Sequence, residues 1–273
     1  MAGADIEAAA RVSAAAFGVD LSDPWSAGRW RQRVSHLLGT DPDGAFVAER
    51  DGRVIGAAQA MRRERLWCLS LLAVQGAAQS AGAGRALLAA ALDYDDGTDA
   101  GLIVSSNDPR ALALYARSGF TLRPTLQATG PVDRRVLPPR PSDVNTAGRD
   151  DLEALADISR SVRGAPHTTE IEYALGRGAA VVQIEGRGFA VAQPGHGVWL
   201  LVARDEPAAS ALLWAALEIA GDSERVVRWI TAGQDWAIQI AVAAGLRLGS
   251  YGALAVRGEP GPMRPFLPSS PFA

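Results

Sequence analysis

The feature that most constrains the fold of this chain is an internal repeat: four segments of its first half recur, in the same order, in its second half. The pairs, each given with its first residue, are DIEAAARVSAAAFG (Asp5) with DLEALADISRSVRG (Asp151), DGRVIGAA (Asp51) with EGRGFAVA (Glu185), RALLAAAL (Arg85) with SALLWAAL (Ser210), and ALALYARSGF (Ala111) with AIQIAVAAGL (Ala237). Each pair alone is weak evidence in a chain so rich in alanine. Four pairs in one order predict a tandem duplication.

The two copies are separated by a stretch rich in proline and small polar residues, LPPRPSDVNTAG, which runs from Leu137 to Gly148. Such a composition is typical of a linker between domains. The chain has 273 residues, which is enough for two domains of ordinary size. We therefore predict domains at residues 1–136 and 149–273, joined by a linker at residues 137–148.

Within the first copy, the sequence alternates between helical and strand patterns. We expect helices over about residues 5–17, 25–38 and 108–119, and a further helix that begins near Arg85 and ends near residue 94. We expect strands over about residues 45–49, 53–62, 66–74, 101–106 and 120–130. Asp51 and Gly52 are a strong hairpin signal between the first two strands. Pro109 suits the first turn of the last helix, and Gly119 suits its end. This order predicts an α/β domain around a mixed sheet.

The composition excludes several classes of function. The net charge is −3 and no basic stripe stands out, so we expect no nucleic-acid partner. No apolar run reaches the roughly 18 to 20 residues of a membrane span, so we expect no membrane partner. The single cysteine, Cys68, allows no internal disulfide, which fits a reducing cytoplasmic protein. The histidines show no metal-ligand spacing, and no lysine is present as a site of self-modification.

A glycine turn, QSAGAG from Gln79 to Gly84, comes between the buried strand pattern and the helix that begins near Arg85. Amides of a first helical turn have no internal partner and carry the positive end of the helix dipole. Glycines let an anion approach them closely. The turn is not a P-loop, and Leu87 stands where a dinucleotide fingerprint has its third glycine. Two interpretations stay open: a plain packing turn and a pyrophosphate site.

The segment downstream of this turn carries a resemblance to a known family. The sequence resembles the GNAT acetyltransferase superfamily, whose acyl-coenzyme A signature, Gln/Arg-x-x-Gly-x-Gly/Ala, stands here as QSAGAG. The second signature of the family, an Asn, an Ala, a Leu-Tyr and a Gly-Phe, stands here as Asn107, Ala111, Leu114-Tyr115 and Gly119-Phe120. The resemblance covers most of residues 1–135 and is only a degenerate echo in the second half. It implies two GNAT-like domains, each a mixed, mostly antiparallel sheet flanked by helices.

The resemblance implies a role for each matching position. The residues expected at acetyl-coenzyme A, the co-substrate, are Gln79, Gly82, Ala83, Gly84, Arg85 and Ala86 at the pyrophosphate, and Leu72, Ala73, Val74 and Asn107 along the pantetheine arm. Tyr115 would be the general acid that protonates the departing thiolate. The alternative for Tyr115 is a half-buried aromatic residue on an amphipathic helix.

A general base is harder to place, because the strand pattern LWCLSLLAV contains no acid. Glu64 lies just before it and could act through a water molecule, although a glutamate at a hairpin end is usually solvated. Cys68 has no basic neighbour in the sequence and is interpreted as a core residue. Tryptophans and acids between Gly18 and Trp30 could receive a cationic amine, or could simply anchor a helix.

In the second copy the site residues are missing. The segment Arg204-Asp205-Glu206-Pro207-Ala208-Ala209, which has no glycine, stands in place of the glycine turn, Ala241 in place of Tyr115, and Gly233 in place of Asn107. We therefore predict that the second domain binds no acyl-coenzyme A.

The sequence as a whole predicts a tandem GNAT-like N-acetyltransferase, a monomer or homodimer that acetylates an amine of a small molecule or peptide without a metal. Two alternatives stay open. One is a non-catalytic acyl-coenzyme A sensor. The other is an enzyme similar to mycothiol synthase, a family that also pairs two GNAT folds but carries the intact site in the other half.

Overall fold

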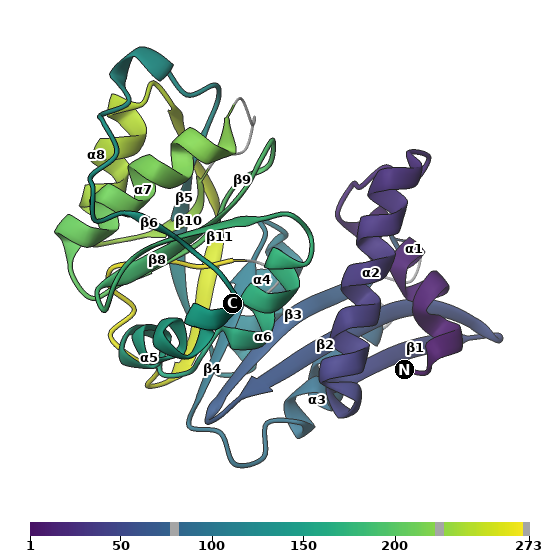
Figure 1. The fold of residues 1–273 in the computed structure, drawn as a ribbon. Coiled ribbons are helices and arrows are strands. Elements are labelled where there is room, and N and C mark those ends of the chain that lie inside the picture. The colour runs from purple at the N-terminus through teal and green to yellow at the C-terminus, as the bar shows by residue number, and fades with distance from the viewer. Residues whose placement is uncertain (77–81, 222–226, 270–273) are drawn as a thin grey trace. The chain divides into compact units, whose positions relative to one another are not determined.

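The computed structural model describes residues 1–76, 82–221 and 227–269 (Figure 1). The chain forms two compact units, Met1–Gly101 and Leu102–Ala273, and each is described by itself. The boundary between them falls inside strand β4 (Ala100–Ser105), not at the predicted linker. A compact unit of the structure need not coincide with one copy of a sequence repeat. The predicted domain boundaries at residues 137 and 148 therefore stay a prediction.

The first unit is built on three antiparallel strands. Its elements in chain order are α1 (Ile6–Ala16), α2 (Pro24–Thr40), β1 (Ala45–Arg50), β2 (Arg53–Arg63), β3 (Leu66–Val74) and α3 (Ala83–Asp93). The predicted hairpin between β1 and β2 is confirmed: Asp51 and Gly52 have positive φ values of 53° and 70°. Two such residues match the right-handed twist of the flanking strands.

Helices cover both faces of this three-stranded sheet. Ala57 of β2 belongs to a core cluster with Ala9 and Ala10 of α1. A Cβ atom on the preceding Gly56 would lie 2.8 Å from Leu87 Cδ1 of α3. Successive strand residues point to opposite faces of a sheet, so α1 and α3 lie on opposite faces of β2. The N-terminus of α3 is therefore held by close packing on the sheet.

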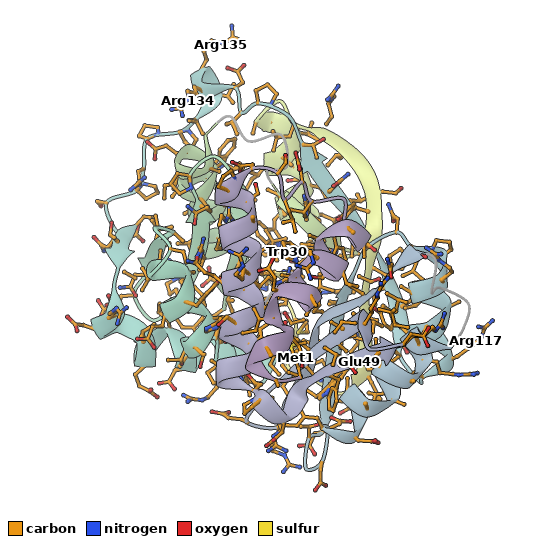
Figure 2. The ribbon with its side chains drawn as sticks, turned by 90° about the vertical axis from the view of Figure 1, so that its right-hand side faces the viewer. Met1, Trp30, Glu49, Arg117, Arg134 and Arg135 are labelled. Atoms are coloured by element: carbon orange, nitrogen blue, oxygen red, sulfur yellow. The ribbon has the colours of Figure 1, made fainter. Side chains whose placement is uncertain are left out.

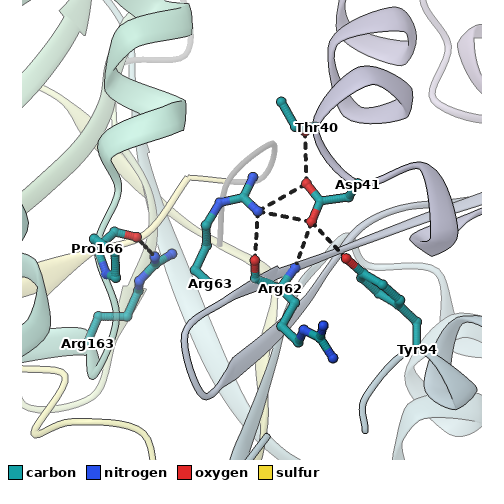
Figure 3. A network of polar contacts seen from close by, with 7 residues as sticks. All are labelled: Thr40, Asp41, Arg62, Arg63, Tyr94, Arg163 and Pro166. Carbon is teal, nitrogen blue, oxygen red and sulfur yellow. Dashed lines mark hydrogen bonds and ion pairs between the residues drawn. The ribbon is translucent and has the colours of Figure 1, made fainter. Parts of the chain in front are cut away.

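A buried ion-pair network ties the loop after α2 to the end of β2 (Figure 3). Asp41, whose side chain is 2% exposed, accepts two hydrogen bonds of 3.0 Å from Arg63 Nη1. The same carboxylate accepts from the Arg62 amide at 3.0 Å and from the hydroxyls of Thr40 and Tyr94. Burial raises the pKa of the Tyr94 phenol, and the charge of Asp41 raises it further. The network is a structural anchor of the first unit.

The second unit contains the rest of the first copy and all of the second. Its elements after β4 are α4 (Pro109–Arg117), β5 (Thr121–Thr129), β6 (Asn145–Ala147), α5 (Leu152–Arg163), α6 (Thr168–Leu175), β7 (Ala180–Ile184), β8 (Gly188–Gln193), β9 (Gly197–Ala203), α7 (Glu206–Ala220), β10 (Val227–Thr231), α8 (Asp235–Ala243), β11 (Arg247–Gly258) and β12 (Phe266–Leu267). Neighbouring strands run in the order β4-β11-β5-β10 in one sheet and β12-β9-β8-β7-β6 in the other.

The order of elements is the same in both copies: two helices, three strands, a helix, a strand, a helix and a strand. Each of the four sequence pairs lies on equivalent elements. The copies even begin alike, because the Asp5 carboxylate accepts from the Ala2 amide and the Asp151 carboxylate from the Gly148 amide, both at 2.7 Å. The predicted α/β fold class, with mostly antiparallel sheets flanked by helices, is confirmed.

Strand pairing departs from a simple arrangement of two independent domains. Strand β11, the last of the second copy, lies between β4 and β5 of the first copy and pairs antiparallel with β5. Part of the predicted linker is also ordered, because β6 pairs with β7. Phe266 and Leu267 of the C-terminal tail form β12, which pairs antiparallel with β9. No helix in the described part of the chain is long and apolar enough to span a bilayer.

Candidate functional site

The N-terminus of α3 carries the predicted pyrophosphate site. Gly82 is its N-cap residue and has a left-handed backbone with φ 86°, a conformation that favours glycine. Glycine has no side chain with which to cap the first turn. Arg85 and Ala86 are exposed, so the turn is accessible. The predicted contact residue Gln79 lies outside the described residues.

The environment of Gly84 separates the two interpretations of the glycine turn. Among the described atoms, a Cβ at this position would meet only Val74 Cγ2, at an ordinary contact distance of 3.6 Å. Packing against the described residues therefore does not require glycine at position 84, although the left-handed backbone favours it at position 82. A Cβ at Gly82 would lie 3.8 Å from Arg85 Nη2, so this guanidinium reaches over the turn. The residues fit an anion held by bare amides and a cation better than a packing turn.

Strand β3 supplies the residues expected along the pantetheine arm. Leu72, Ala73 and Val74 pair with β2 through Ala58, Ala57 and Gly56. The ladder has a bulge just before them, because Leu69 and Leu71 face Ala60 and Gln59 and leave Ser70 as the extra residue. Bulges redirect strands and occur often beside active sites.

The bulge at Ser70 has a cationic partner that the sequence analysis missed. Arg33 of α2 donates a hydrogen bond from Nη2 to the Ser70 carbonyl at 2.7 Å. A continuous apolar run such as LWCLSLLAV contains no local signal of a bulge, and Arg33 lies 37 residues away in sequence. Sequence patterns could not have paired the two.

The remaining predicted residues, Asn107 and Tyr115, belong to the second unit and lie next to or on α4. Asp108 is the N-cap residue, accepts from the Arg110 amide at 2.9 Å, and is followed by Pro109 as expected. The hydrogen bond and charge of Arg110 lower the pKa of the Asp108 carboxyl. Asn107 precedes this cap, and its Oδ1 accepts a hydrogen bond from the Gly252 amide of β11.

Tyr115 lies in the last turn of α4 and is only 5% exposed. Burial raises the pKa of its phenol above the ordinary value near 10, and the charge of Asp108 raises it further. The phenol therefore stays protonated through the physiological range and can act as a hydrogen-bond donor.

The structure places the two other candidates for chemistry differently. Glu64 is exposed in the turn between β2 and β3, where it has a positive φ of 51°. This is the hairpin-end position at which a glutamate is normally solvated. Cys68 is fully buried in β3, in agreement with its interpretation as a core residue.

Trp30, considered for an aromatic wall around a cationic amine, lies on α2 (Figure 2) and is already engaged. Its Nε1 donates to Ser13 Oγ at 2.6 Å, and the Arg33 guanidinium lies 5.1 Å from the ring centroid. Asp20 accepts from the amide of Ser22, and Asp23 accepts from the amide of Ser26. These contacts favour the alternative, in which the loop and Trp30 anchor α2.

Comparison with known proteins identifies the first copy. A sequence model described as the acetyltransferase (GNAT) family matches residues 13–120. The matched segment, residues 13–120, therefore has the sequence of a GNAT-family acetyltransferase. The family predicted from the two signatures is thus confirmed, and it is a family of acetyltransferases. Within the described residues, no group of three or more potential metal ligands gathers.

Two curated relatives share part of this sequence. The mycothiol acetyltransferases of Streptomyces bingchenggensis and Streptomyces coelicolor are 37% identical over 86 residues and 36% identical over 90 residues. These stretches cover 30% and 31% of this chain, and 28% and 29% of the relatives. The chain therefore matches less than a third of the length of these relatives.

Solved structures resemble this chain over more of its length. A putative acetyltransferase from Pyrococcus horikoshii has a TM-score of 0.77 at 17% identity and covers 98% of this chain and 89% of its own. A tandem GNAT protein from the clavulanic acid biosynthesis pathway has a TM-score of 0.53 at 16% identity, with coverage of 84% and 87%. At these identities the likeness concerns the fold.

Proposed function

We propose that this GNAT protein is an N-acetyltransferase that transfers an acetyl group from acetyl-coenzyme A to an amine of a small molecule or peptide. The observation that carries the proposal is the N-terminus of α3, with its left-handed Gly82 and its exposed Arg85, inside a segment that matches the GNAT family. The amides of residues 82–85 would bind the pyrophosphate, because the Ala86 amide already donates to the Gly82 carbonyl at 3.0 Å. Residues 72–74 and Asn107 would bind the pantetheine arm.

The proposed reaction is direct attack. The amine nitrogen forms a bond to the thioester carbonyl carbon, the carbon–sulfur bond breaks, and coenzyme A leaves as a thiolate while the amine loses a proton. A backbone amide of residues 72–74 would stabilise the oxyanion. Glu64 is the candidate acceptor of the amine proton through water. Most of the acceleration would come from orienting the two reactants.

The environment of Tyr115 sharpens its proposed role. An ordinary thiol has a pKa of about 8.5, below the raised pKa of this phenol. Complete proton transfer from Tyr115 to the thiolate is therefore uphill. Tyr115 would first stabilise the departing sulfur as a hydrogen-bond donor and act as general acid only as negative charge develops there.

Replacing Tyr115 by Phe tests this role. We expect turnover to fall about 10²-fold or more, in the range of general acid–base contributions, while acetyl-coenzyme A affinity stays near that of the wild type. Because the active phenol is the protonated form and its pKa is raised, wild-type turnover should show no loss attributable to Tyr115 below about pH 10. Unchanged turnover in Y115F would remove Tyr115 from the mechanism.

The exposed position of Glu64 favours one alternative, a non-catalytic acyl-coenzyme A sensor, because no buried base has been assigned. A panel of amines, including desacetyl-mycothiol, separates the two functions. Since the chain has no lysine, transfer of labelled acetyl groups to its own side chains would give little background. Acetyl transfer to any amine on the panel supports the enzyme, whereas tight coenzyme binding without transfer supports the sensor.

A further inference from the structure

The second copy contacts the end of β4 at two neighbouring positions. Trp229 of β10 donates a hydrogen bond from Nε1 to the Ser105 carbonyl at 3.0 Å. The Gly252 amide of β11 donates to Oδ1 of Asn107, which lies two residues after Ser105. Both contacts lie within the second unit, so they belong to one compact body. Residues of the second copy thus hold the segment that carries Asn107.

Gly252 is suited to this contact by its conformation and its lack of a side chain. It has a φ of 60°, and a Cβ atom would lie 1.9 Å from the Ser105 carbonyl oxygen. The pairing of β11 with β5 is also irregular between Ser250 and Ala253, which turns the backbone at this position. Only glycine allows β11 to approach Ser105 and Asn107 this closely.

The backbone conformation and ring contacts of Trp229 also fix its position. Its φ is 53°, a left-handed conformation that is rare for a bulky residue, and the pairing of β10 is irregular on either side of it. The Tyr251 ring lies 5.4 Å away, and the Arg228 guanidinium lies 5.7 Å from the Trp229 ring and 5.3 Å from the Tyr251 ring. Strained residues of this kind often serve functional sites.

These contacts fix the orientation of the Asn107 amide. The Gly252 N–H is a donor, so the atom of Asn107 that faces it must be the carbonyl oxygen. The amide nitrogen branches to the other side of the same planar group. We infer that Gly252 and Trp229 are positioning residues, supplied by the second copy, that present Asn107 Nδ2 as a hydrogen-bond donor to a carbonyl of the pantetheine arm. This inference rests on the proposed function.

The test compares two ligands by calorimetry on the full chain: acetyl-coenzyme A, and 3′-phosphoadenosine 5′-diphosphate, which lacks the pantetheine arm. Asn107→Asp keeps the oxygen that accepts from Gly252 but removes the donor. We expect its Kd for acetyl-coenzyme A to rise roughly threefold to tenfold, the loss of one hydrogen bond, with little change for the nucleotide. Ser106→Asp adds the same charge one residue earlier and controls for repulsion.

A second variant tests the positioning role without touching Asn107. Trp229→Phe removes the donor to the Ser105 carbonyl. We expect the Kd for acetyl-coenzyme A to rise a few fold and the Kd for the nucleotide to stay unchanged. Trp236→Phe is the matched control, because Trp236 Nε1 donates to Gln234 instead, at 2.8 Å. We expect this control to bind both ligands with the same Kd as the wild type.

The outcomes separate the inference from the proposed function. Selective weakening of acetyl-coenzyme A by Asn107→Asp and Trp229→Phe supports the inference. If the wild type binds acetyl-coenzyme A and Asn107→Asp binds it equally well, or matches Ser106→Asp, the inference is wrong and the proposed function stands. Equal weakening of both ligands by Trp229→Phe also overturns it. If the wild type binds neither ligand, the proposed function fails and the inference with it.

Discussion

Helices α3 and α7 occupy the same place in the two copies, yet their N-termini differ in one decisive respect. Gly82 leaves the first turn of α3 without a capping side chain. At the corresponding end of α7, the Asp205 carboxylate accepts from the Ala208 amide at 2.8 Å and pairs with Arg187 at 2.6 Å. In the proposed function, one copy would offer its first-turn amides and Arg85 to an external anion, whereas the other caps its first turn with a carboxylate of its own.

The rest of the second copy follows the same trend. Ala241, the counterpart of Tyr115, is fully buried and has no proton to donate. Gly233, the counterpart of Asn107, lies against Arg264, since a Cβ there would be 2.5 Å from Cζ of the guanidinium. Arg264 in turn donates to the Ala232 carbonyl at 3.0 Å. Where the first copy has its candidate site residues, the second copy has internal contacts, which supports the prediction that it binds no acyl-coenzyme A.

The largest expected effect concerns whether the copies are separable at all. Because β11 lies between β4 and β5, a fragment of residues 1–136 would leave both strands without their common neighbour. We expect this fragment to show no cooperative thermal transition in circular dichroism. A fragment that melts cooperatively and binds acetyl-coenzyme A would show that the first copy is an independent domain.

The buried pair of Asp41 and Arg63 belongs to the first copy and should have the next largest effect. Asp41→Ala leaves Arg63, 11% exposed, without this carboxylate, and should lower the free energy of unfolding by about 3–5 kcal/mol. Asp99→Ala is the matched control, because the pair of Asp99 with Arg65 is exposed and should matter little. Urea denaturation measures both. Equal effects would mean that the Asp41 network is no anchor.

Gly82 allows the first copy to be converted toward the second. Gly82→Asp should weaken acetyl-coenzyme A about a hundredfold or more, because a like charge beside the pyrophosphate costs several kcal/mol and each ~1.4 kcal/mol is a factor of ten. Gly82→Asn tolerates the left-handed backbone equally and lacks the charge, so it should lose less than about tenfold. Calorimetry on both variants would contradict a pyrophosphate site if their affinities were the same.

The smallest effect is expected at Asp205. Asp205→Ala should cost about 1 kcal/mol of stability, the usual value of a helix cap, whereas Asp205→Asn should cost little. Hydrogen bonding from Arg187 lowers the pKa of Asp205, so its charged form stabilises the fold above the unfolded pKa of about 3.9. That contribution is lost as the pH falls through the lower folded pKa. Urea denaturation at pH 7 and pH 3 would contradict this account if the cost of Asp205→Ala were larger at pH 3.

Local signals explain how much of this fold could be predicted from the sequence. The apolar run at residues 66–74 coincides with β3, and Gly119 has the predicted left-handed backbone, with a φ of 86°. Both depend on neighbouring residues alone. The cap at Asp205 was also within reach, because aspartate with proline two residues later is a helix-start signal.

Features that depend on distant residues could not be predicted in this way. The insertion of β11 beside β4 brings Gly252 to Asn107 across 145 residues, and no local pattern specifies that pairing. The bulge at Ser70 and the left-handed Trp229 arise from strand register, which the partner strand decides. The family signatures predicted the candidate site residues. The residues that support them, such as Gly252 and Trp229, could be identified only in the structure.

The most direct test of the difference between the copies is the stoichiometry of acetyl-coenzyme A binding to the full chain, measured by isothermal titration. We expect one site per chain, whose affinity falls about a hundredfold or more in Gly82→Asp and is unchanged in Asp205→Ala. Two sites per chain would show that the carboxylate cap of α7 does not exclude the coenzyme. An absence of binding would show that the glycine turn of α3 serves only the fold.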